Sequence, residues 1–388
     1  MKSVRQWMPA VLGLVLLLAL LVAACAPAAA PTATPTKAPA AATTPQAAST
    51  AATQATPATK PTTAAQATPP AKATTVKFGS PGSVSDAGVY IAVEKGYFKE
   101  LGLDVQVLPF QSGPTMIAPL AAGELDVAGG TISTALLNAI DRGVALKAVA
   151  GKGSSTKGFE FSQVNPRKDL ADSGQIKEIK DLKGKKISCS SAKSGCESQV
   201  AYLLKRGGLT INDIELVAMA YPDMMAALAN KAVDAAQLIE PTLSAAVEQG
   251  LAVVWDKGFS SDSYGGEYQA AILVYSEQFT KNVDAARRFM VGYVKGERDY
   301  NDAFAKGKNK SDIVNILIKY TAQKDPALYN KMQMPYLEPN GKNNMNSLQM
   351  DLDYFIQMGY YTGPVKKVDS IVDNQFADYA VQQLGAYK

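Results

Sequence analysis

Hydroxyl, amide and carboxylate side chains, together with aromatic rings, follow several predicted buried strands of this 388-residue chain. Such polar groups can hydrogen-bond a small molecule, and the rings can stack on a planar one. In open α/β sheets, ligands bind where loops leave the carboxyl ends of strands. We therefore predict that the ligand is contacted by Ser83, Ser85, Asp86, Tyr90, Phe110, Gln111, Ser112, Thr131, Ser133, Ser155, Ser191, Ser194, Tyr221 and Glu240.

Most of these residues also have a purely structural interpretation. Tyr90 shares helical spacing with Val93 and Tyr97 and can belong to the core instead. The serines can be helix N-caps, and this alternative is strongest for Ser112 and Ser194. The pattern predicts a polar, ring-bearing site and leaves open which side chains touch the ligand.

The charges of the set bear on the kind of ligand. Asp86 and Glu240 would oppose an anion, and the rings suit a neutral aromatic heterocycle with several hydrogen-bonding groups. Tyr264 and Tyr268, near a predicted hinge, can add another aromatic face. Lys193 keeps an anionic ligand such as a sulfonate open.

Catalytic arrangements find little support in the sequence. The chain contains no histidine, which removes Ser-His and Cys-His catalysis and any histidine-ligated metal centre. The run at residues 151–156, GKGSST, lacks the spacing of a phosphate-binding loop and is interpreted as a polar cleft loop after a strand. Glu124 and Asp126 fit a helix-to-strand turn better than an acid/base pair. No metal or cofactor is predicted, and no basic run indicates a nucleic-acid partner.

Cys189 and Cys196 are the cysteines of the predicted folded region. In an exported domain they can form a disulfide, and two free thiols are the alternative. Two thiols without histidine are too few for a zinc site.

The first 24 residues have the pattern of a secretory signal peptide. Lys2 and Arg5 precede an apolar run at residues 11–22, which is short for a membrane span and ends in Ala23-Ala24-Cys25. Small residues before a cysteine are typical of lipoprotein processing, so Cys25 is predicted to carry the lipid anchor. Residues 25–74 are rich in Ala, Pro and Thr and are predicted to be a tether. The folded part is thus expected at the outer face of the cytoplasmic membrane.

Two stretches of the chain resemble each other, at residues 99–143 and 205–250. In both, a glycine that can end a helix precedes a strand pattern, a helix pattern and a second strand pattern. A strand-helix-strand order with apolar strands indicates parallel pairing. The duplication predicts two similar α/β lobes.

Four short motifs occur in the order EKGYF, GLDV, GELDV and DLKGKK, between residues 94 and 186. In this order they resemble the NMT1/THI5-like group of ABC-importer solute-binding proteins, which includes sulfonate, nitrate and taurine binders. The resemblance implies a type II periplasmic-binding-protein fold, in which two α/β lobes enclose a ligand cleft. It also implies an ABC permease and a cytoplasmic ATPase as partners, and binding without catalysis.

On this interpretation the first lobe spans residues 75–163. The crossover and second lobe span 164–264, with a strand expected at 252–255. Residues 265–388 return to the first lobe and add C-terminal helices, the last expected at 370–384. Glu240 can then bridge the lobes or lie in solvent.

The resemblance also suggests ligands. Because the cleft is rich in tyrosine and the chain lacks histidine, it resembles the riboflavin-binding members most, and riboflavin or a related flavin is the first prediction. A thiamine-pathway pyrimidine, or a sulfonate or nitrate, is the alternative. The pyrimidine-synthesising branch of the family is thought to use a histidine that this chain lacks. An extracellular enzyme is the alternative of another class.

Overall fold

The computed structural model describes residues 73–387. The predicted signal peptide, Cys25 and nearly all of the predicted tether lie outside the described residues. Within residues 73–387, no helix is both long and apolar enough to cross a membrane.

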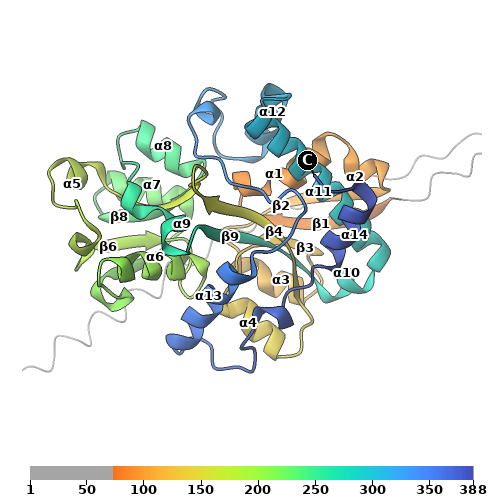
Figure 1. The fold of residues 1–388 in the computed structure, drawn as a ribbon, viewed down its shortest axis with the longest axis horizontal. Helices are drawn as coiled ribbons and strands as arrows, with labels where there is room; N and C mark the ends of the chain where they lie inside the picture. The colour runs from red at the N-terminus through yellow and green to blue at the C-terminus, as the bar shows by residue number, and fades with distance from the viewer. Residues whose placement is uncertain (1–72, 388) are drawn as a thin grey trace, which may run out of the picture. The chain divides into compact units, whose positions relative to one another are not determined.

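The first lobe is built on a sheet with strand order β2-β1-β3-β9-β4 (Figure 1). Its strands are β1 (Thr74–Ser80), β2 (Leu103–Pro109), β3 (Val127–Gly130), β4 (Lys147–Thr156) and β9 (Glu267–Tyr275). β1 runs parallel to β2 and β3, whereas β9 runs antiparallel to β3 and β4. The loops that follow β1, β2 and β3 therefore leave the same edge of the sheet.

The second lobe is built on a sheet with strand order β5-β8-β6-β7. Its strands are β5 (Ser162–Pro166), β6 (Lys186–Cys189), β7 (Glu215–Ala218) and β8 (Ala235–Ile239). β6 runs parallel to β7 and β8, and β5 runs antiparallel to β8. The order β7-β6-β8 thus repeats the order β2-β1-β3 of the first lobe, which confirms the predicted duplication.

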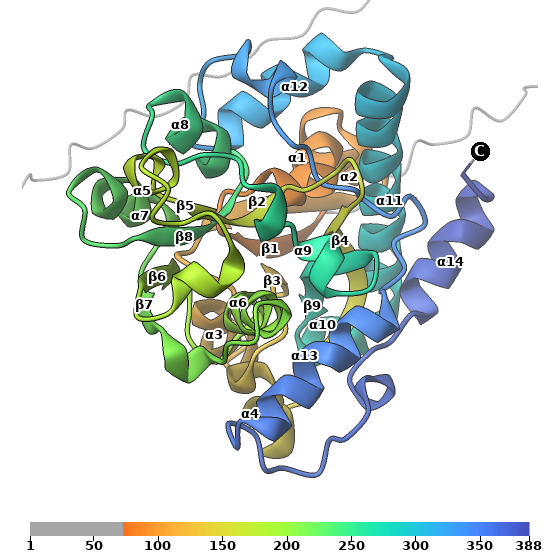
Figure 2. The ribbon, with the colours of Figure 1, turned by 60° about the vertical axis from the view of Figure 1, so that its left-hand side comes forward.

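Helices follow the strands of each lobe along the chain. In the first lobe they are α1 (Ala87–Glu94), α2 (Tyr97–Glu100), α3 (Ile117–Ala121) and α4 (Thr134–Asp141). In the second lobe they are α5 (Lys168–Asp172), α6 (Gly195–Arg206), α7 (Tyr221–Ala229), α8 (Thr242–Glu248) and α9 (Ser260–Ser263). The chain passes from β4 to β5 and returns from α9 to β9, so two segments join the lobes (Figure 2).

The C-terminal region adds α10 (Glu277–Lys281), α11 (Val283–Lys306), α12 (Lys310–Tyr320), α13 (Met345–Gln357) and α14 (Gln375–Leu384). α11 packs against α1, α12 and α14, whereas α13 lies beside α6 of the second lobe (Figure 2). The C-terminal region therefore completes the first lobe and also contacts the second.

The sheet of the first lobe is covered on both faces. Val127 packs in the cluster that contains Phe78 and Phe289, whereas its neighbour Ala128 packs in the cluster that contains Leu136. Successive strand residues point to opposite faces, so burial on both sides produces the continuous apolar strand pattern seen in the sequence.

Three local predictions differ from the structure. Residues 252–255 are not a strand: Ala252 forms one isolated bridge with Arg167, and the neighbouring Pro166 has no N–H to extend a ladder. Residues 151–156 belong to strand β4 rather than to a loop. The last helix begins at Gln375, because a short 3₁₀ turn (Val368–Ser370) precedes it.

Candidate ligand-binding cleft

A cavity of about 60 Å³ lies where loops from both lobes meet. Its walls include loops that follow β1, β2 and β3 of the first lobe and β6 and β7 of the second. The carboxyl ends of strands are the position at which open α/β sheets bind ligands. Its lining comprises Pro81, Ser83, Ser85, Ser112, Gly113, Gly129, Gly130, Thr131, Lys152, Phe161, Ser162, Ser190, Cys196, Tyr221, Gln237, Ile239, Tyr268, Ala270 and Ala271. Hydroxyl groups dominate the polar part of this surface.

Several predicted contacts are brought together in this lining. Ser83, Ser85, Ser112, Thr131 and Tyr221 all face the cavity. They come from loops far apart in the sequence, as expected if the ends of the strands meet at one place. Burial raises the pKa of Tyr221 to about 12.

Tyr268, predicted as an additional aromatic face, also lines the cavity and is almost fully buried. Tyr264 instead packs behind it, with ring centroids 4.4 Å apart. The Tyr268 hydroxyl donates to the carbonyl of Gly195 at 2.8 Å, so this ring also connects β9 to α6.

Other predicted contacts lie outside the lining. Tyr90 is fully buried and stacks on Tyr320, with ring centroids 4.4 Å apart, so the core interpretation describes it better. Phe110 packs at the edge of the first lobe's core, and Gln111 is exposed. Ser155 is buried and accepts a hydrogen bond from the amide of Ser162.

The remaining serines of the set stabilise local structure or the contact between lobes. Ser133 caps α4 by accepting from the Leu136 amide at 3.3 Å, and it pairs with Ser194 in an isolated antiparallel bridge. The Ser194 hydroxyl donates to the carbonyl of Ser191 at 2.7 Å. Ser191 lies in the loop between β6 and α6 and does not line the cavity. The N-cap interpretation therefore describes Ser133, whereas Ser194 occupies the N-cap position of α6 without a cap hydrogen bond from its side chain.

Lys152 is the functional candidate that the sequence interpretation missed. It lies in β4, lines the cavity and is only 1% exposed. Its ammonium donates to Asp86 Oδ1 at 2.5 Å and to Ser85 Oγ at 3.0 Å. An ammonium has three N–H donors, and among residues 73–387 no further acceptor is paired with this one. One donor is left for a ligand.

Asp86 forms an ion pair with Lys152 and does not itself line the cavity. It is fully buried and also accepts from Ser80 Oγ at 2.7 Å and from the Tyr90 hydroxyl at 3.2 Å. The predicted repulsion between Asp86 and an anion is therefore offset by Lys152, because the two opposite charges form a buried pair. A lysine within an otherwise buried strand was the signal that could have identified this pair.

The second lobe contributes a network of buried amides and hydroxyls. Gln237 Nε2 donates to Ser162 Oγ at 2.8 Å and to Gln199 Oε1 at 3.1 Å. Its Oε1 accepts from the Tyr221 hydroxyl at 3.4 Å. The network orients Ser162, Gln237 and Tyr221 at the cavity wall, and a lone glutamine in an apolar strand was its sequence signal.

Backbone and side-chain contacts hold the two lobes against each other around the cavity. The Thr134 amide donates to the Lys193 carbonyl, and the Gly195 amide donates to the Ile132 carbonyl, both at 3.1 Å. Lys193, the sequence candidate for an anion ligand, is exposed and lies over the ring of Tyr360. The described arrangement is a closed one.

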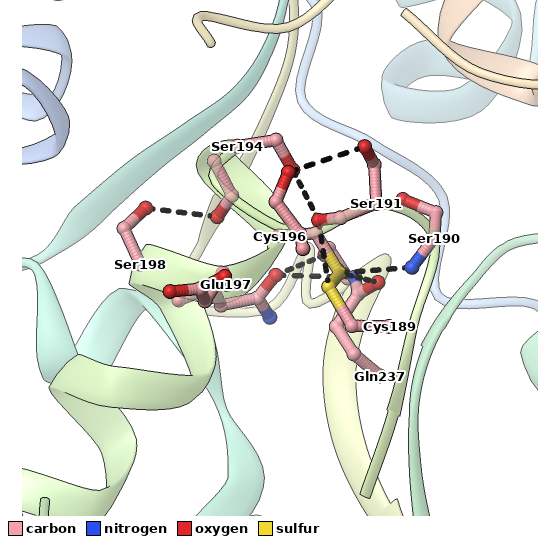
Figure 3. Close-up of a disulfide and its surroundings, with 12 residues drawn as sticks. Cys189, Ser190, Ser191, Ser194, Cys196, Glu197, Ser198 and Gln237 are labelled. Carbon is pink, nitrogen blue, oxygen red and sulfur yellow. Dashed lines mark hydrogen bonds between the residues drawn. A yellow bond between two sulfur atoms is a disulfide. The ribbon is translucent and has the colours of Figure 1, made fainter. Parts of the chain in front are cut away.

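Cys189 and Cys196 form a disulfide at the cavity, with their Cα atoms 6.0 Å apart (Figure 3). The disulfide alternative of the sequence interpretation thus describes this structure. The bridge joins the end of β6 to the first turn of α6 and encloses the loop that carries Ser190. It limits the conformations available to a loop that lines the cavity and contacts the other lobe.

Replacing both cysteines by serine is expected to lower the free energy of unfolding by about 2 kcal/mol, because the disulfide restricts the unfolded chain. The loss is at the lower end of the usual range because the loop that the disulfide closes is short. Urea unfolding of the variant and of the parent, with and without a reductant, measures this. The reductant should have no effect on the variant. An equal stability of oxidised and reduced parent would contradict the prediction.

Comparisons with known proteins found relatives both by sequence and by structure. A Brucella abortus protein named as a binding protein is 27% identical to this chain over 276 residues. The match covers 70% of this chain and 76% of the Brucella protein. The alkanesulfonate-binding protein SsuA of Xanthomonas axonopodis pv. citri, bound to MOPS, has a TM-score of 0.62 at 18% identity, covering 78% of this chain and 99% of its own.

The nitrate-binding protein NrtA of Synechocystis PCC 6803 has a TM-score of 0.64 at 17% identity, covering 81% of this chain and 90% of its own. At these identities the structures show the fold alone, and they confirm the predicted α/β periplasmic-binding-protein fold. The family described as NMT1/THI5 like matches residues 84–305, which is more than half of the chain. The protein therefore belongs to the NMT1/THI5-like family.

Proposed function

We propose that the protein is the extracytoplasmic solute-binding component of an ABC importer and that its ligand carries a small oxyanion group, as sulfonates and nitrate do. It binds this solute and passes it unchanged to an ABC permease driven by a cytoplasmic ATPase. The observation that carries the ligand class is the spare donor of Lys152 inside a hydroxyl-lined cavity.

The chemistry of the cavity supports an oxyanion. A charged donor and several hydroxyls are the groups that satisfy the multiple lone pairs of sulfonate or nitrate oxygens. The loops that line the cavity also lead into helices, including α4, α6 and α7, and the dipole of a helix favours negative charge near its N-terminus. Two similar proteins of this fold are named as binders of alkanesulfonate and nitrate.

A flavin is the weaker candidate. Tyr221 and Tyr268 favour it, because both line the cavity and could contact a flat ring. Against it, a cavity of about 60 Å³ has room for only a few water molecules, so a three-ring ligand would require the lobes to move apart. Tyr90 and Phe110, which suggested stacking, lie outside the lining.

Membrane attachment through a lipid on Cys25 is part of the proposal. It is supported by the small residues before Cys25 and by the apolar run that precedes them. Mass spectrometry of the protein isolated from membranes, compared with a Cys25→Ser variant, tests it. An unmodified cysteine in the membrane-associated protein would exclude the anchor.

Calorimetry with alkanesulfonates, nitrate, riboflavin and a thiamine-pathway pyrimidine tests the ligand class. We expect binding of an oxyanion and, in the charge-free double variant Asp86→Asn/Lys152→Met, an affinity at least about tenfold lower, because a charged hydrogen bond contributes about 1.5–3 kcal/mol. The double substitution is used because it leaves neither partner as an isolated buried charge.

The matched control is Lys193→Met, which removes an exposed lysine outside the cavity and should leave the affinity unchanged. Binding of riboflavin alone would return the ligand to the flavin class. Binding of an oxyanion with equal affinity by the double variant would remove Lys152 from the site. If the recovered ligand is chemically altered, the importer proposal is excluded.

A further inference from the structure

Two fully buried carboxyl side chains connect the lobes at separate places. Asp351 lies in α13 and contacts α6 of the second lobe, and Glu240 lies between β8 and α8 and contacts the segment before α13. Neither of them lines the ligand cavity. Their burial depends on the closed arrangement, because each is covered by the opposite lobe.

Asp351 receives two hydrogen bonds on the same oxygen. Ser198 Oγ donates to its Oδ1 at 2.5 Å and the Tyr264 hydroxyl donates to its Oδ1 at 2.6 Å. Its Oδ2 is buried and has no hydrogen-bond partner among the described residues, and a Cβ added at Gly195 would lie 3.2 Å from it. This oxygen thus faces the start of α6.

The titratable groups around Asp351 are almost all tyrosines. Tyr264 and Tyr268 approach from the segment that joins the lobes, and Tyr202 approaches from α6. Glu197, also in α6, is bonded by Tyr354 of α13 at 2.8 Å. Within residues 73–387 no lysine or arginine forms an ion pair with Asp351, so its negative charge would lack a buried counter-charge.

Glu240 is held by neutral donors from both lobes. Ser244 Oγ donates to its Oε1 at 2.8 Å and the Ser244 amide donates to its Oε2 at 3.1 Å. From the first lobe, the Gln333 amide donates to Oε1 at 2.9 Å. Tyr300 and Tyr329 are the titratable groups that face it.

An ion pair also connects these segments, but it does not involve Glu240. Lys331 lies 3.7 Å from Glu248, and both side chains are largely exposed. Glu240, like Asp351, therefore has no ion-pair partner in the described part of the chain. Burial of an uncompensated carboxylate disfavours the charged form.

We infer that closure of the lobes takes up protons at Asp351 and Glu240, so that the closed form is favoured as the pH falls. The inference concerns the movement of the lobes and holds for any ligand. It adds to the proposed function a coupling between solute capture and the acidity outside the cell.

The direction follows from the difference between the closed and open forms. Burial raises the pKa of Asp351 and that of Glu240 to about 7 in the closed form, whereas a carboxyl exposed to water titrates near pH ~4. The contribution of each protonated carboxyl to closure is complete below pH ~4 and is lost as the pH rises through about 7.

Hydrogen exchange measured without ligand tests the inference independently of the ligand class. The amides of Thr134 and Gly195 donate across the lobes, so their protection reports closure. After correction for the intrinsic exchange rate, we expect their protection to fall about tenfold or more between pH 5 and pH 8. Amides of the β6–β8 ladder serve as internal controls within one lobe.

The variants Asp351→Asn and Glu240→Gln, alone and together, should reduce and then abolish this pH dependence, since a neutral amide cannot titrate. The matched variants Asp353→Asn in α13 and Glu248→Gln in α8 change exposed carboxylates nearby and should retain it. Equal protection at both pH values in the parent would overturn the inference. A pH dependence that persists in the folded double variant would overturn it as well.

Discussion

The single substitution Asp86→Asn is expected to lower the free energy of unfolding by about 3–5 kcal/mol, because it leaves the Lys152 ammonium buried and without a counter-charge. Both side chains of this pair are at most 1% exposed, so solvent does not screen the loss. Urea unfolding of parent and variant, monitored by circular dichroism, measures the change. The loss should also weaken ligand binding, because Lys152 lines the cavity.

The double variant Asp86→Asn/Lys152→Met should recover most of the lost stability, since it removes both charges. The exposed pair Lys281–Glu277 provides the control, and Glu277→Gln should cost less than about 1 kcal/mol. A double variant as unstable as Asp86→Asn would show that the pair is not an isolated electrostatic unit. A loss below about 1 kcal/mol for Asp86→Asn would contradict the prediction directly.

The fold was predictable because it depends on local patterns that occur twice. A glycine that ends a helix, an apolar strand and a following helix recur at residues 99–143 and 205–250, and the structure contains them as β2-α3-β3 and β7-α7-β8. Equivalent strands have the same neighbours in the two sheets. Periodicity and chain order carry this information without any long-range contact.

The site was predictable only in part. Ser83, Ser112 and Tyr221 were located because they follow strands, and the strand ends meet in the fold. Lys152 was missed because its meaning depends on Asp86, a partner 66 residues away, and a lysine beside glycines resembles a loop. Residue type alone does not reveal which charge is paired.

Residue type alone was also insufficient to predict the role of Glu240. Its type suggested a ligand contact, with a bridge between the lobes as an alternative. Its position after β8 brings it to the segment that contains Gln333, so the bridge describes this structure. Asp351 was not predicted at all, because an acidic residue in an amphipathic C-terminal helix looks solvent-facing. Only the packing of α13 against α6 makes it a buried group.

The substitution Gly296→Val is expected to lower the free energy of unfolding by about 3 kcal/mol or more, because α1 and α11 approach each other at this residue. A Cβ at Gly296 would lie 2.0 Å from the Gly88 carbonyl oxygen, a backbone atom that cannot rotate away. The helices would have to separate. Since Asp86 immediately precedes α1, the separation should also disturb its pair with Lys152 and weaken ligand binding.

The control on the same helix is Ala305→Val, at an exposed position near the end of α11, which should cost less than about 1 kcal/mol. Urea unfolding and calorimetry on both variants separate the two effects. If Gly296→Val lowers stability and leaves the ligand affinity unchanged, the position of α1 does not affect ligand binding. A variant as stable as the parent would contradict the prediction, because it would show that α1 and α11 can separate without loss of stability despite the close contact between Gly88 and Gly296.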